Sequence, residues 1–127
     1  MQLRPARLMA ASLVVISCAC ATVGGRSHRD RDVLTRDEML KDNFVTVYDA
    51  VTALRSNWLN VRPNTLTSNQ EDVVVYYDVT RLGGPAELRN IAVRDIQYVQ
   101  HLDPVSATQR YGVGHSQGVI FVSTHPR

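Results

Sequence analysis

Residues 110–124 read RYGVGHSQGVIFVST, and the local fold of this stretch decides how the whole chain is interpreted. Residues 114–118, GHSQG, match the G-x-S-x-G pattern that surrounds the nucleophile of many serine hydrolases. In those enzymes a strand leads into the serine and a helix follows it. Here a predicted helix ends near Tyr111 and a predicted strand begins after Gly118, so the order is reversed.

The sequence around Ser116 also lacks the partners of a catalytic triad. No Asp or Glu follows Ser116, and His125 lies beyond the predicted strand. We therefore predict that the protein is not an enzyme. Three glycines in the same stretch are spaced G-x-G-x-x-x-G, one residue away from the dinucleotide-binding fingerprint, and the strand again lies on the wrong side. No cofactor is expected.

The chain begins with the three parts of a secretory signal: a basic start, an apolar run at residues 8–16, and then small residues. The apolar run is too short to span a bilayer. Residues 15–18, VISC, resemble the bacterial lipobox, in which the cysteine becomes the lipidated mature N-terminus. We expect residues 1–17 to be a signal peptide and Cys18 to carry lipid, which makes the protein an exported outer-membrane lipoprotein facing the periplasm or the cell surface. Cleavage after Ala21 is the alternative, and it gives a soluble periplasmic protein.

Removal of the signal peptide leaves a neutral chain of one-domain size. Taking 17 residues from 127 leaves 110, and the loss of Arg4 and Arg7 lowers the basic count from 14 to 12, equal to the 12 acidic residues. A nucleic-acid partner is not expected, because binding to nucleic acid requires a basic face. Both cysteines, Cys18 and Cys20, precede the domain, so an internal disulfide or a cysteine metal site is not expected in it. The four histidines are scattered along the sequence, and no metal site is expected.

Helix signals dominate the first half of the presumed domain, residues 33–125. Before it, residues 18–32 are rich in glycine, serine and charge, and we expect them to form a flexible tether reaching about 20 Å. Thr35 and Glu38 form a capping box that predicts a helix start. The apolar stripe of residues 47–58 predicts a second helix with Trp58 in the core.

Strand signals alternate with short helices in the second half. We predict strands at residues 73–79, 96–103 and 118–124, and a weak strand around residues 59–62. Pro85 and Pro104 sit at the first positions of two further helices. The tyrosines Tyr76, Tyr77, Tyr98 and Tyr111 are candidates to line a binding face, but we expect some of them to be half-buried strand residues with their hydroxyls in water. The fold class is therefore a small two-layer α+β domain with a mixed sheet of about three to five strands and three to four short helices.

Residues 96–124 resemble the end of the plug domain of TonB-dependent outer-membrane receptors. In that family a strand leads to a helix of small residues, then Tyr-Gly, a glycine-rich loop, and a closing GVI strand that ends in threonine. The matching residues here are Ile96–Leu102, Ser106-Ala107, Tyr111-Gly112, Gly118-Val119-Ile120 and Thr124. Upstream, LTRDEM at residues 34–39, the helix at 47–54 and VVVYYDVTRL at 73–82 extend the resemblance over most of the domain.

The sequence departs from the plug pattern at three places. Asp78-Val79 stands where the family has Asp-Gly, and a turn with positive φ at its second position would strain Val79. Trp58-Leu59 stands where Pro-Gly commonly ends the second helix. The sequence stops at Arg127, where a receptor continues into its barrel. The resemblance therefore implies a plug-like domain alone, attached to lipid, which docks another envelope protein such as an outer-membrane receptor or a secretion assembly.

The candidate binding residues lie in the 112–118 loop and in the turn after the 73–79 strand. We expect docking through this loop or through the exposed edge of the sheet. The alternative is a soluble periplasmic or secreted module that binds a small ligand beside Asp78 and His115. The candidate residues are Asp78, Arg81, Tyr111, Gly112, Gly114, His115 and Gly118.

Overall fold

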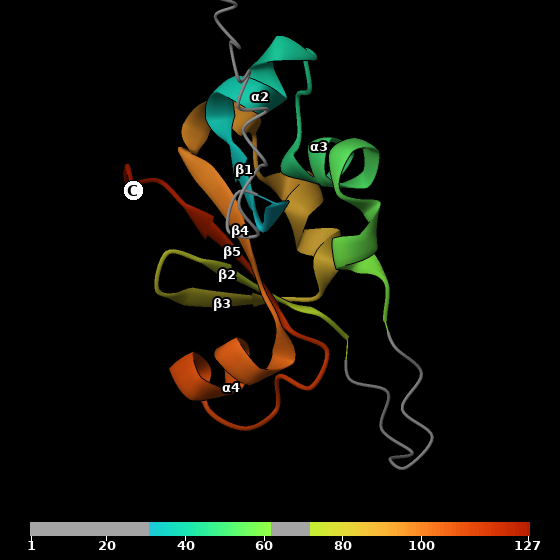
Figure 1. Cartoon of the computed structure of the whole chain (residues 1–127). Helices are drawn as coiled ribbons and strands as arrows, with labels where there is room; N and C mark the ends of the chain where they lie inside the picture. Colours follow the sequence, from blue (N-terminus) through green and yellow to red (C-terminus); the bar gives the residue numbers. More distant parts are fainter. Residues whose placement is uncertain (1–30, 62–71) are drawn as a thin grey trace, which may run out of the picture.

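A computed structural model describes residues 31–61 and 72–127, which contain a five-stranded mixed sheet (Figure 1). The strand order is β1-β4-β5-β2-β3. The parallel pair is β2 with β5, and the other neighbouring strands are antiparallel. The strands are β1 (Val33–Thr35), β2 (Val74–Tyr77), β3 (Thr80–Gly83), β4 (Tyr98–Leu102) and β5 (Val119–Ser123). This arrangement confirms the predicted small α+β domain.

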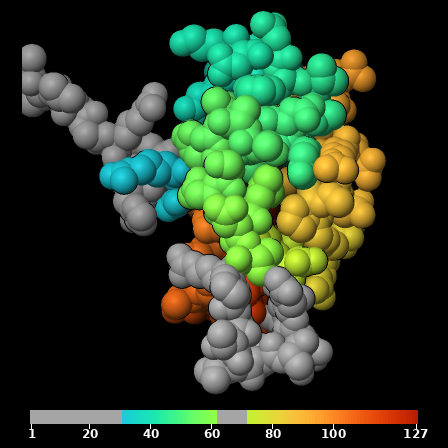
Figure 2. Space-filling model, turned by 90° about the vertical axis from the view of Figure 1, so that its right-hand side faces the viewer, coloured from blue at the N-terminus to red at the C-terminus, as the bar shows by residue number. Residues whose placement is uncertain are grey.

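Helices cover the two faces of the sheet unequally. One face carries α2 (Arg36–Lys41), α3 (Val47–Leu54) and the 3-10 helices η1 (Ser56–Leu59), η2 (Pro85–Asn90) and η3 (Val93–Asp95), which hide much of the sheet in Figure 2. Helix α4 (Pro104–Tyr111) packs on the opposite face. None of the helices within the two described ranges has the length and apolar character needed to cross a membrane.

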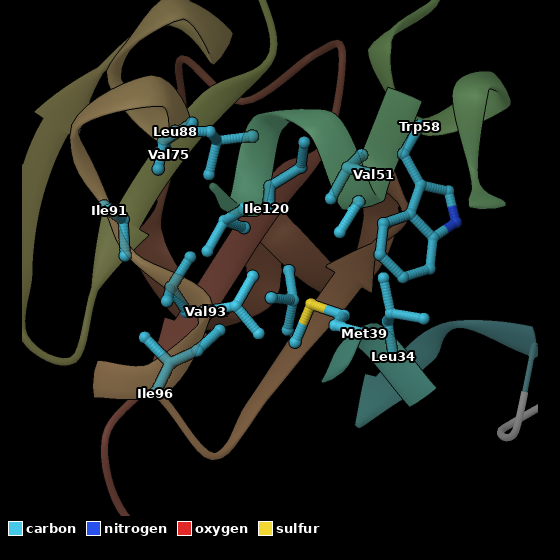
Figure 3. Packing of buried hydrophobic residues seen from close by; sticks show 14 of the residues in the cluster. Leu34, Met39, Val51, Trp58, Val75, Leu88, Ile91, Val93, Ile96 and Ile120 are labelled. Atoms are coloured by element: carbon cyan, nitrogen blue, oxygen red, sulfur yellow. The ribbon is translucent and has the colours of Figure 1, made fainter. Parts of the chain in front are cut away.

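The hydrophobic core is divided between these two faces. The larger cluster includes Trp58, which is 1% exposed, together with side chains from the α2–α3 region and from η2 and η3 (Figure 3). The smaller cluster lies under α4 and contains Val74, Ala107, Val119 and Phe121. All residues of β5 are buried. The prediction that Trp58 belongs to the core is confirmed.

Short polar motifs set the helix starts as the sequence predicts. The Thr35 side chain accepts from the Glu38 backbone N–H, and the Glu38 carboxylate accepts from the Thr35 N–H at 3.0 Å, completing the capping box of α2. Asp103 caps α4 by accepting from the backbone N–H groups of Val105 at 2.9 Å and Ser106 at 3.1 Å. Pro104 and Pro85 both occupy first-turn positions.

Several predicted boundaries were wrong or incomplete. The edge strands β1 and β3 were not predicted, because β1 has three residues and β3 is largely exposed and shows no apolar alternation. Leu59 belongs to a 3-10 helix and not to the predicted weak strand, which extends into residues outside those described. The folded part also begins before Val33, since the Asp32 carbonyl accepts from the His101 N–H at 2.8 Å and the Arg31 carbonyl from the Arg55 guanidinium at 3.2 Å.

The Asp103 cap gives a stability prediction. We expect Asp103→Ala to lower the free energy of unfolding of the full chain by about 1 kcal/mol, because two helix N–H groups lose their acceptor. Urea unfolding at pH 7 measures this change. The control is Asp37→Ala on the exposed first turn of α2, for which a smaller loss is expected. An equal loss in both variants would contradict a specific capping role.

Candidate functional site

The glycine-rich loop of residues 112–118 connects the end of α4 to β5, so a helix precedes Ser116 and a strand follows it. Gly112, Gly114 and Gly118 have φ values of 87°, 92° and 88°. At Gly118 an added Cβ would also lie 2.6 Å from the Leu102 carbonyl oxygen. The G-x-S-x-G glycines therefore serve the backbone path of a helix-to-strand connection, and the strand–serine–helix geometry of a nucleophile elbow is absent from this loop.

His115 anchors this loop from inside. It is 5% exposed, its Nδ1 lies 2.9 Å from the Gly112 carbonyl oxygen, and its Nε2 lies 3.0 Å from the Tyr76 hydroxyl. A carbonyl can only accept, so Nδ1 carries a proton. In the neutral ring Nε2 must then accept from Tyr76. Both ring nitrogens are used by the fold, and neither is left to act on Ser116.

Aromatic rings surround His115 on the α4 face of the sheet. The Tyr76 and Tyr111 rings stack with centroids 4.1 Å apart, and the His115 ring lies 5.8 and 5.7 Å from them. The Arg110 guanidinium lies 4.7 Å from the Phe121 ring centroid, within cation–π range.

The Tyr111 hydroxyl is not solvated, in contrast to what was expected for some of the tyrosines. It is buried and has no hydrogen-bond partner among the residues that the structure describes. Burial raises the pKa of Tyr111, and the charge of Arg110 only partly opposes this shift. The hydroxyl therefore stays neutral at physiological pH.

A cavity of about 440 Å³ lies between β3 and the same loop. It brings together two of the predicted binding residues, Arg81 and Gly114. Its wall is completed by Asp72, Val73, Val74, Gly83, Gly84 and Val113. Gly112 and His115 belong to the same loop and Tyr111 ends the helix before it, whereas Gly118 packs against the end of β4.

A second cavity, of about 310 Å³, lies beside Trp58 and was not predicted. The Trp58 ring stacks on His101 with centroids 5.6 Å apart, and Asn57, Asn60 and Gln117 contribute amides to the lining. The Asp103 carboxylate also borders it, but this group caps α4. Hydrogen bonds from the Ser106 hydroxyl and N–H hold the pKa of Asp103 below its usual value.

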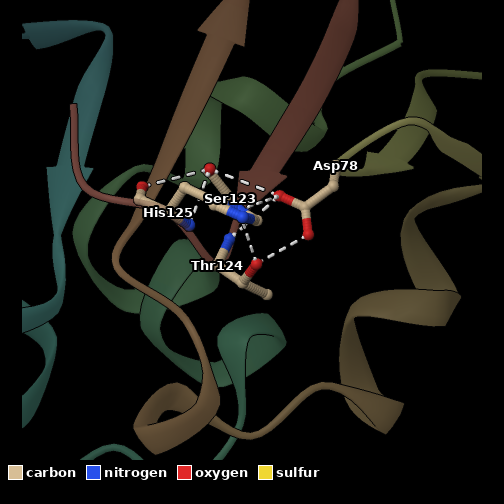
Figure 4. A network of polar contacts seen from close by, with 4 residues as sticks. All are labelled: Asp78, Ser123, Thr124 and His125. Atoms are coloured by element: carbon tan, nitrogen blue, oxygen red, sulfur yellow. Dashed lines mark hydrogen bonds and ion pairs between the residues drawn. The ribbon is translucent and has the colours of Figure 1, made fainter.

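Asp78 lies at the other end of β2 from the glycine-rich loop. Because β2 runs parallel to β5, the residue that follows β2 meets the residue that follows β5. The Asp78 carboxylate accepts from the Thr124 N–H at 3.0 Å, the Thr124 hydroxyl at 2.8 Å and the Ser123 hydroxyl at 3.3 Å (Figure 4). Asp78 therefore bonds the residues that follow β5, whereas His115 precedes β5 and bonds Tyr76 and Gly112, so the two predicted residues belong to separate polar clusters.

The contacts of Asp78 superficially resemble a catalytic relay, since the Thr124 hydroxyl also lies 2.9 Å from His125 Nδ1. The hydroxyl proton goes to the Asp78 carboxylate, which can only accept, so His125 Nδ1 must donate to the hydroxyl oxygen. A general base would have to accept that proton instead. These contacts therefore fasten the C-terminal segment to the β2–β3 turn.

The turn between β2 and β3 accommodates Asp78-Val79 in place of Asp-Gly. The positive φ falls on Asp78, at 50°, and Val79 is not among the residues with positive φ. Aspartate tolerates this conformation better than a β-branched residue does. The predicted strain at Val79 is therefore avoided.

Sequence reasoning missed the partners that define both polar clusters. Tyr76 was recognised only as a half-buried tyrosine, and Ser123 and Thr124 only as the end of a strand. Their pairing with His115 and Asp78 depends on the parallel alignment of β2 and β5, for which the sequence carries no local signal. Within the described ranges, no group of three or more His, Cys, Asp or Glu side chains is arranged to hold a metal ion. Cys18, the predicted lipidation residue, lies outside the described residues.

In comparisons with protein-family models, curated proteins and solved structures, no match to this chain was found.

The loop glycines give a graded stability prediction. We expect Gly118→Ala to lower the free energy of unfolding by about 3 kcal/mol or more, since the left-handed φ and a backbone contact both oppose a side chain. Gly112→Ala meets open space and should cost about 1–2 kcal/mol from φ alone. Gly84→Ala, with φ of −83° and no atom within 4 Å, is the control and should change stability by less than about 1 kcal/mol. Denaturant unfolding of the three variants tests the order.

The Asp78 contacts give a pH prediction. Burial raises the pKa of Asp78, but hydrogen bonds from Thr124 and Ser123 and the charge of His125 outweigh it and hold the pKa below its usual value. A lowered folded-state pKa contributes stability that is present above the unfolded pKa of about 3.9 and is lost as pH falls through the folded value. We therefore expect Asp78→Asn to cost about 1–2 kcal/mol at pH 7 and less below pH 4. Urea unfolding at pH 7, 5 and 3 measures this, and a cost that does not vary with pH would contradict it.

Proposed function

We propose that this protein is a non-enzymatic docking module of the bacterial cell envelope. In this proposal lipid on Cys18 holds the chain to the outer membrane, and the plug-like α+β domain binds another envelope protein. An outer-membrane receptor or a secretion assembly is the kind of partner that the resemblance to TonB-dependent receptor plugs implies. The module would itself perform no transport.

The observation that carries the proposal is an exposed rim at one edge of the sheet. We define the β3 rim as β3 with Val79 and the loop residues Val113 and Gly114. Three of the six large hydrophobic side chains that are exposed in the described residues lie on it: Val79 at 93%, Val113 at 92% and Leu82 at 39%. Val79 lies in the turn before β3 and Val113 lies near Gly83 at its other end, so these side chains follow the length of the edge. Apolar side chains exposed along one edge support a protein-binding role.

The use of the polar groups supports binding over chemistry. His115 is held by Gly112 and Tyr76, and the Asp78 carboxylate by Thr124 and Ser123. Groups whose hydrogen bonds are taken up inside the fold stabilise it and are poorly placed to act on a substrate.

The segments that carry the family resemblance correspond to whole elements: β4, α4, the glycine-rich loop and β5.

The position of the tether also supports this function. The described residues that precede β1 join the domain at this edge, and β3 is at the opposite edge of the five-stranded sheet. Four interstrand spacings separate them, about 19 Å. A lipid attached through residues 18–32 would therefore leave the β3 rim on the side of the domain away from the point of attachment.

Lipid labelling and crosslinking test the proposal together. We expect the full chain, expressed with a C-terminal tag, to incorporate radiolabelled palmitate and to crosslink to an envelope protein in intact cells. Cys18→Ala should lose the label. A mature N-terminus at Thr22 without label would contradict the lipid anchor, and the absence of any crosslinked partner would contradict docking.

A further inference from the structure

The backbone of β3 has an unused side. The strand pairs with β2 only, and among the described residues its backbone makes no hydrogen bond to any other element. Its side chains are also largely exposed. An edge of this kind can form backbone hydrogen bonds with another extended chain. Many peptide-binding domains recognise their ligands by such strand addition.

The opposite edge of the sheet is protected. At β1 the Thr35 N–H is taken by the Glu38 carboxylate, and α2 follows directly. Val33 and Leu34 are 6% and 0% exposed. The two edges of the sheet therefore differ, and only β3 offers both backbone groups and accessible side chains.

Arg81 supplies a charge to this edge. It is exposed, it makes no ion pair or hydrogen bond within residues 31–61 and 72–127, and it lines the 440 Å³ cavity next to Val113 and Gly114. Asp72 also lines the cavity. A carboxylate of a bound segment would be attracted by Arg81 and repelled by Asp72, so we expect it on the Arg81 side. An unpaired guanidinium beside an open strand edge favours a segment that brings an Asp or Glu side chain.

A bulge limits how much of β3 can pair. Arg81 lies opposite Tyr76 and Gly83 opposite Val75, which leaves Leu82 without a direct partner on β2. Bulges on edge strands discourage unspecific strand pairing. A bound segment would make few backbone hydrogen bonds, and contacts to Arg81 and Val113 would supply its specificity.

We infer that β3 is the docking edge of the module, and that it takes up an extended segment of the partner protein which places an acidic residue against Arg81 and an aliphatic residue against Val113 in the same cavity. This inference rests on the proposed docking function and specifies its site and the chemistry of the partner.

Site-specific photocrosslinking in intact envelopes tests the inference with the full chain. Benzoylphenylalanine is introduced at Thr80 or Leu82 on β3, and at Thr52 on the exposed side of α3 as a control position. The crosslinked peptide of the partner is then sequenced. We expect crosslinks from β3 and not from Thr52, to a partner segment that contains Asp or Glu.

Charge substitutions at Arg81 sharpen the test. Arg81→Glu should reduce the crosslink from Leu82 about tenfold or more, since like charges would face each other. Arg81→Lys keeps the charge and should retain most of the yield. Changing the partner's acidic residue to Lys should restore crosslinking to Arg81→Glu. Thermal unfolding by circular dichroism checks that the exposed substitutions leave the domain folded.

Each other outcome contradicts the inference. Crosslinks from Thr52 but not from β3 would leave the docking function in place and overturn the site. Crosslinks from Leu82 to a second copy of this chain, or yields independent of the charge at residue 81, would overturn the proposed occupant. The absence of a partner at every position would contradict the docking function as well.

Discussion

The structure depends on the burial of β5 between β4 and β2. Its residues are apolar on both sides, so both faces of the sheet must be covered along this strand. Ile120 and Val122 enter the large core under α3 and the 3-10 helices, while Val119 and Phe121 enter the small core under α4. One strand therefore determines where the helices pack. The β3 edge is open because β3 is the terminal strand and pairs with β2 alone among the described strands.

Two polar anchors hold the ends of the parallel β2–β5 pair. At one end Tyr76 contacts His115 just before β5, and at the other Asp78 contacts Thr124 just after it. Parallel pairs are slightly less stable per residue than antiparallel ones, and the chain between these two strands is long. Side-chain hydrogen bonds at both ends add to the ladder and fix its register. Histidine, aspartate and threonine, which in a sequence suggest chemistry, here hold two distant segments together.

Local signals predicted the parts of the fold that depend on neighbouring residues. The capping box at Thr35, the Asp103 cap and the glycines of the 112–118 loop all act within a few residues, and their roles could be derived from the sequence. The edge strands could not, because β3 is an exposed four-residue strand without apolar alternation, and the glycines and proline at residues 83–85 indicate a turn at this point of the sequence. The site was predicted only in part for a related reason: Arg81 and Gly114 share a cavity, but Asp78 and His115 lie at opposite ends of a strand pair whose direction is a property of the whole sheet.

The same arrangement explains why binding at β3 need not disturb the rest of the fold. β2 contributes Val75 to the large core and Val74 to the small core, whereas β3 contributes no buried side chain to either core. Segments with few buried apolar contacts open and rearrange at low free-energy cost. A partner strand added at β3 would form hydrogen bonds with the unpaired backbone groups of this edge. The hydrogen bonds of His115 and Asp78 would keep β2 and β5 in place. The proposed lipid anchor enters at the other edge, through β1, so attachment and docking would act on opposite sides of one rigid sheet.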